Sequence, residues 1–169
     1  MQFINQFYKS HKKEIFLFLL MLGLELVMIF VLSQKNDLEV FFRSDGTEYQ
    51  RLVGNIINNR SFSLEPAAPL IPTDYRTPGY PFWLSIIYLV FKSFTPAIFI
   101  GATAFALSAP LVYLIAKEIF KEKIALWAAI IFAIEPWAIF QSGFLVAEQI
   151  FLPFLLFSIY LFCRYLKLE

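Results

Sequence analysis

The sequence has a single cysteine, Cys163, so an internal disulfide framework is excluded. Charge is also scarce, because Lys, Arg, Asp and Glu make up 16% of the chain and nearly cancel to a net charge of +1. Proteins that bind nucleic acid carry a basic excess, so no nucleic-acid partner is expected. A cleavable signal peptide is lacking too, because the first apolar run is too long for one and no small-residue cleavage site follows it.

Apolar side chains dominate what is present: 59% of the residues are hydrophobic and 21 are phenylalanine. Soluble domains are about 45–50% apolar, so the composition predicts an all-α integral membrane protein with one membrane domain over residues 1–169. A helix of about 20 residues crosses a bilayer. The long apolar runs predict about four transmembrane helices, the first of them a signal anchor, at residues 15–33, 96–116, 124–140 and 149–166.

Basic residues set the expected orientation. If the N-terminus lies inside, the short inner segments hold these basic residues: Lys9, Lys12, Lys13, Lys117, Lys121, Lys123, Arg164 and Lys167. In the outer loop, residues 34–95, acidic residues balance the basic ones. This asymmetry obeys the positive-inside rule and places both termini inside.

The outer loop is expected to form two amphipathic juxtamembrane helices. Asp45-Gly46-Thr47-Glu48 has the spacing of a capping box, and one apolar face follows up to Asn58-Asn59. The proline-containing residues 61–79 should be extended or turning. Residues 80–94 are apolar over too short a run to span, which predicts a second surface helix.

Three polar positions on the outer side are candidates for chemistry. Asp45, with Glu48 one turn later, is a general base or simply the cap of its helix. Arg76 is a bidentate phosphate ligand or an arginine that snorkels to lipid phosphates. Glu148 lines a cavity or is a carboxylate that the dipole of its helix stabilises. Within the first span, Glu25 is either functional or a bundle-facing carboxylate.

The order of these features resembles a known family. The chain has an early outer-loop acid in SDGTEYQRLVGNI, then RTPGYPFWL, then a basic turn, and finally an acid that opens the next span in AEQIFLPFLLF. This order is similar to the N-terminal part of GT-C fold membrane glycosyltransferases. The closest branch is the protein mannosyltransferase and aminoarabinose transferase group, with dolichyl-phosphate-mannose-protein mannosyltransferase-like proteins. The resemblance covers roughly residues 10–166 and is most specific in D-x-x-E-Y and R-x-P-G-Y-P.

The resemblance implies roles for individual residues. Asp45 matches the catalytic base that activates an acceptor hydroxyl, Arg76 matches a basic position near the lipid-linked phosphate, and Glu148 matches an acid that lines the cavity. Glu48 and Tyr49 join Arg76 and Glu148 as substrate-binding residues, although the family's paired acids are adjacent and Asp45 and Glu48 are three positions apart.

The implied activity is transfer of a sugar from a polyprenyl-phosphate donor to an acceptor hydroxyl at the outer face of a cell membrane, the inner or plasma membrane of a bacterium. No cofactor is assigned, and a divalent cation is left open. Family members continue with further spans, so three expectations stay open: an N-terminal fragment of a larger enzyme, one half of a split enzyme whose fold a second polypeptide completes, or a catalytically incomplete relative. The alternative is a non-catalytic assembly subunit or lipid-head-group-binding protein with the same fold.

Overall fold

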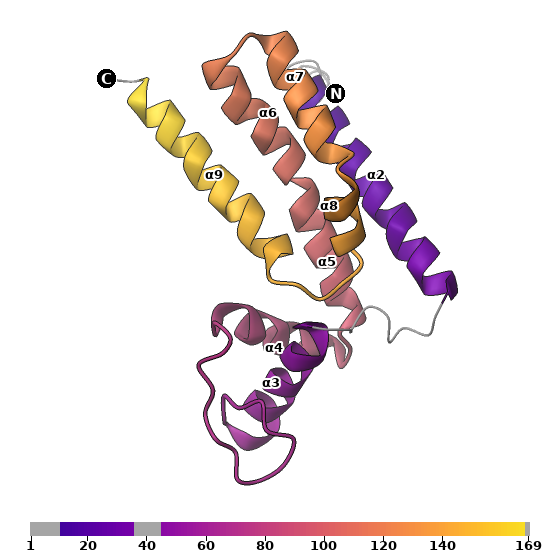
Figure 1. The fold of residues 1–169 in the computed structure, drawn as a ribbon, viewed down its shortest axis with the longest axis vertical. Coiled ribbons are helices and arrows are strands. Elements are labelled where there is room, and N and C mark those ends of the chain that lie inside the picture. The colour runs from indigo at the N-terminus through magenta and orange to yellow at the C-terminus, as the bar shows by residue number, and fades with distance from the viewer. Residues whose placement is uncertain (1–10, 36–44, 168–169) are drawn as a thin grey trace.

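The computed structural model describes residues 11–35 and 45–167, and these residues contain helices and no strands. The helices, labelled as in Figure 1, are α2 (Lys12–Lys35), α3 (Asp45–Asn59), α4 (Gly79–Phe91), α5 (Thr95–Ala106), α6 (Ser108–Ile119), α7 (Glu122–Ala133), α8 (Pro136–Gln141) and α9 (Glu148–Leu166). The predicted all-α membrane architecture is confirmed.

Three stretches are long and apolar enough to cross a membrane: Lys12–Gln34, Thr95–Ile119 and Glu148–Leu166. They correspond to the predicted spans 15–33, 96–116 and 149–166. The middle stretch consists of α5 and α6, which meet at Leu107. Pro110 lies just beyond this break, and a proline cannot donate the backbone hydrogen bond that a continuous helix requires there.

The remaining predicted span, 124–140, is divided into α7 and α8, so no single helix of sufficient length forms there. Glu135 accepts a hydrogen bond from the Ala138 amide at 2.6 Å and caps α8, and Pro136 occupies the first helical position. The two helices together still run along the bundle beside α2 (Figure 1). The predicted interruption at Glu135-Pro136 is therefore present, with Glu135 as the cap of the second helix.

Small residues allow close packing inside the bundle. Ala125, Ala129 and Ala133 of α7 recur every four residues, are fully buried, and belong to one core with Leu17, Met21 and Tyr113. Backbones approach closely across such small-residue faces in membranes. We call the end of the bundle with the start of α2, the α6–α7 turn and the end of α9 the basic end. There Lys13 pairs with Glu122 at 2.5 Å, and Lys167 pairs with Glu118 at 2.8 Å.

The helices α3 and α4 lie together at the opposite end of the bundle, which we call the site end (Figure 1). The α3 bounds agree with the predicted helix, and α4 corresponds to the predicted second surface helix. A second core joins α3 and α4 to the bundle through Ile29 of α2, Ile98 of α5 and Leu145 of the segment between α8 and α9. This core holds the candidate residues of α3 and α4 in place.

Candidate functional site

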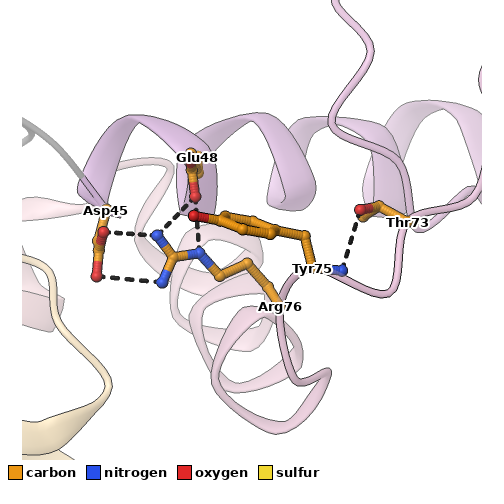
Figure 2. Close-up of polar contacts among 5 residues, drawn as sticks. All are labelled: Asp45, Glu48, Thr73, Tyr75 and Arg76. Atoms are coloured by element: carbon orange, nitrogen blue, oxygen red, sulfur yellow. Dashed lines mark hydrogen bonds and ion pairs between the residues drawn. The ribbon is translucent and has the colours of Figure 1, made fainter.

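Arg76 is the centre of the polar cluster at the site end. Its Nε donates a hydrogen bond to Glu48 Oε2 at 2.7 Å, and Nη2 lies 2.6 Å from the same oxygen. Its Nη2 and Nη1 donate to the two Asp45 oxygens at 2.5 and 3.2 Å. Figure 2 shows the guanidinium between the two carboxylates of α3. One side-on fork and one end-on fork of Arg76 are thus both occupied by acids.

Aromatic rings surround this ion cluster. The Arg76 guanidinium carbon lies 5.3 Å from the Tyr49 ring centroid and 5.1 Å from that of Tyr75, within cation–π distance. Tyr49 then meets Tyr80 edge to face with centroids 4.7 Å apart, and Tyr80 stacks on Trp83 at 5.5 Å. The structure therefore brings Asp45, Glu48, Tyr49 and Arg76 into direct contact, although Arg76 lies near the far end of the loop 61–78 that follows α3.

Asn55, which the sequence did not single out, determines the path of that loop. It is buried on α3, and its side-chain amide donates hydrogen bonds to the carbonyl oxygens of Ser63 at 2.7 Å and Glu65 at 3.0 Å. The Thr73 amide then donates to the Phe62 carbonyl at 2.9 Å, which closes the loop. These bonds return the chain along α3, so that Arg76 reaches the first turn of the helix.

The cluster keeps its arginine charged and its tyrosines neutral. Burial lowers the Arg76 pKa, but hydrogen bonds to Asp45 and Glu48 outweigh this effect and raise it overall. Burial also raises the pKa of Tyr49; Arg76 lowers it, and the negative charges of Asp45 and Glu148 raise it. The pKa of Tyr80 is raised by burial and further by Tyr49 and Glu148. Both phenols are therefore hydrogen-bond donors at neutral pH.

Glu148 lies in the first turn of α9 and is exposed. Ala147 and Ile150, on either side of it, pack against the core that contains Tyr49 and Tyr80. Its charge acts on both tyrosines, but Glu148 has no hydrogen bond or ion pair with Arg76 among the described residues. The structure therefore places Glu148 beside the cluster and leaves its carboxylate outside the Arg76 contacts.

Gln149 and Gly101 fix the position at which α9 begins. Gln149 is buried, and its Nε2 donates hydrogen bonds to the carbonyl oxygens of Gln141 at 3.2 Å and Ser142 at 2.8 Å. The Gln149 side chain fits against α5 only because residue 101 is glycine: a Cβ there would lie 2.1 Å from Gln149 Oε1. The sequence signal for helix packing is an apolar period, and the polar Gln149 gives no such signal for its contact with Gly101.

Two other features lie apart from the cluster. Glu25 is fully buried in α2, and neither of its carboxylate oxygens has a hydrogen-bond partner among the described residues. An apolar cavity of about 600 Å³ lies between α2, α6 and α9, where His11, Leu114 and Phe157 are among its lining residues. Over residues 11–35 and 45–167, no group of three or more His, Cys, Asp or Glu side chains could hold a metal ion.

Comparison with known proteins gives one family match. A model described as dolichyl-phosphate-mannose-protein mannosyltransferase matches residues 75–169, more than half of the chain. No curated protein and no solved structure matches the chain. The matched region contains Arg76, Tyr80 and Glu148, whereas Asp45 and Glu48 precede it. The geometry connects these two acids to the matched region through Arg76.

Proposed function

Because the chain belongs to the dolichyl-phosphate-mannose-protein mannosyltransferase family, a family of membrane glycosyltransferases, we propose that it transfers a sugar from a polyprenyl-phosphate donor to an acceptor hydroxyl. The site end is the outer face in this proposal, because the basic residues gather at the opposite end of the bundle and basic segments stay inside.

The observation that carries the proposal is the contact of Arg76 with Asp45 and Glu48 at the membrane-surface end of the bundle. A lipid-linked sugar phosphate presents its reactive carbon at this depth. The reaction needs a proton acceptor and an anion binder within a few ångströms of each other, and this cluster supplies both.

The proposed step uses each group once. Asp45 accepts the proton of the acceptor hydroxyl while the oxygen of that hydroxyl forms a bond to the anomeric carbon of the sugar. The bond between that carbon and the phosphate oxygen breaks, and the phosphate leaves with the electron pair. Arg76 stabilises the charge that develops on the phosphate, and its raised pKa keeps it protonated throughout.

The occupied forks of Arg76 imply an exchange of partners when the donor binds. A phosphate can bind Arg76 bidentately only if it displaces a carboxylate, because Glu48 takes the side-on fork and Asp45 the end-on fork. Displacement at the end-on fork would free Asp45 to accept a proton. Donor binding would then activate the base in the same event that positions the leaving group.

The test is substitution of Asp45 by asparagine in the assembled enzyme. Asparagine keeps the shape and caps a helix as well as aspartate, but it does not accept a proton at neutral pH. We expect D45N to fold and to lose turnover by roughly 10²–10⁴-fold. D74N, which neutralises an exposed acid of the loop, is the matched control and should retain turnover. Full activity of D45N would reject the catalytic role.

The same contacts favour a second candidate, a non-catalytic subunit in which Arg76 only fastens the loop to α3. Its forks are satisfied within the protein, as expected of a structural ion cluster. In this case D45N would be less stable, and no transfer of sugar would depend on it. The turnover and the thermal unfolding of D45N, measured together, separate the two candidates.

A further inference from the structure

Tyr80 carries a buried hydroxyl group that has no hydrogen-bond partner in the described part of the chain. Tyr80 is 7% exposed, and its ring makes an edge-to-face contact with Tyr49 and stacks on Trp83. A buried donor without a partner destabilises a folded protein and calls for an explanation. A phenylalanine would fill the same space at no such cost, so the retained hydroxyl suggests a partner in another state of the protein.

Glu148 is the acceptor that the fold offers. Ala147 and Ile150 pack on the same core as Tyr80, which places the intervening carboxylate at the edge of that core. Glu148 has no hydrogen bond in the described residues and is exposed to solvent. The unpartnered donor of α4 and the unpartnered acceptor of α9 thus both border one core.

We propose that Tyr80 is a positioning residue whose hydroxyl donates a hydrogen bond to the Glu148 carboxylate when the lipid-linked donor occupies the site, which holds that carboxylate beside the Arg76 cluster. The inference rests on the proposed function, because it takes the donor as the ligand of the site.

The energetics explain why the bond forms only with the donor bound. In the empty site, water hydrates the Glu148 carboxylate, and a hydrogen bond from the Tyr80 hydroxyl would not compensate for the loss of that hydration. A bound donor excludes this water, and a charge-assisted hydrogen bond is stronger in a dry site. Because the bond stabilises only the occupied state, its loss weakens donor binding and leaves the empty protein unaffected.

The experiment measures the Kd of a short-chain polyprenyl-phosphate mannose for the full chain in nanodiscs, for wild type, Y80F, E148A and the double variant. Each single substitution should weaken binding by about tenfold, and the double variant should be no weaker, because both remove the same bond. E148Q keeps an acceptor oxygen and should bind better than E148A, but only where Tyr80 is present. Y88F, on the same helix, is the control and should bind as wild type.

Thermal unfolding without the probe provides the structural comparison. Y80F removes an unpartnered hydroxyl, so it should be at least as stable as wild type while it binds the probe more weakly. Unchanged affinity of Y80F, or additive losses in the double variant, would overturn this inference and leave the proposed function intact. If wild type does not bind the probe, both the proposed function and this inference fail.

Discussion

Arg76 satisfies two requirements that compete for the same N–H groups. In the structure its forks hold Asp45 and Glu48, which pairs both acids at the start of α3 with one positive charge and fastens the loop. In the proposed reaction its end-on fork holds phosphate. Its side chain is 19% exposed, so the cluster is open enough for a ligand to reach and dry enough for charge pairing to matter.

Gly101 is a single residue on which the start of α9 depends. An alanine there would place its Cβ 2.1 Å from Oε1 of Gln149, which is buried and anchored through its Nε2. We expect G101A to lower the free energy of unfolding by about 1–3 kcal/mol in detergent, measured by denaturant titration. G23A is the control, because nothing lies within 4 Å of a Cβ at that position. Equal stability of the two variants would show that Gln149 adapts freely.

The sequence identified some of the important residues at the site end and missed others. Asp45 and Glu48 were found through their capping-box spacing and Arg76 through its proline-rich setting, and the structure brings all three together. Tyr80 belongs to the R-x-P-G-Y-P motif but received no role, and Gln149 and Gly101 were not recognised, because their importance lies in contacts between segments distant in sequence. Neither a helical period nor a charge pattern reports such contacts. The roles of Asp45, Glu48, Tyr49, Arg76 and Glu148 remain predictions.

Helix α3 holds the loop that follows it through hydrogen bonds. Its apolar face, with Tyr49, Leu52 and Val53, packs into the site-end core as the helical period predicted. Asn55 is buried as well, and its amide provides two hydrogen bonds that loop carbonyls would otherwise lack. An apolar period predicts the helix and cannot predict the loop, because the loop is held by polar contacts.

This dependence leads to a prediction for Asn55. N55A leaves the carbonyl groups of Ser63 and Glu65 without their donors, at a cost of about 1–3 kcal/mol. We expect faster amide hydrogen exchange over residues 61–76 in N55A, because the loop opens more often. N58A, which truncates an exposed asparagine of the same helix, should exchange as wild type. Unchanged exchange in N55A would mean that packing alone holds the loop.

Apolar run length predicted the spanning elements well, except where a helix is broken. Helices α2 and α9 correspond to long, predominantly apolar runs, whereas 124–140 is divided because Glu135 caps a new helix before Pro136. The proline indicated the interruption. The cap could not be assigned from sequence, because a glutamate before a proline is also compatible with a kinked but continuous helix.

At the scale of the whole molecule, the basic end and the Arg76 cluster lie at opposite ends of the bundle. At the basic end, Lys13 pairs with Glu122 and Lys167 pairs with Glu118, whereas α3 and α4, which hold the Arg76 cluster, lie at the other end of the bundle (Figure 1). Such exposed ion pairs add little stability, so their main effect is on orientation in the membrane. An extracytoplasmic site is part of the proposed function.

The most direct test of the central claim, that Arg76 binds the donor phosphate, is the Kd of polyprenyl-phosphate mannose for the nanodisc-embedded chain. R76K keeps the charge but loses the fork, so its affinity should fall by about tenfold or more. R51K makes the same change at an exposed arginine of α3 and should bind as wild type. Equal affinities of R76K, R51K and wild type would contradict the account and leave Arg76 as a structural link between the loop and α3.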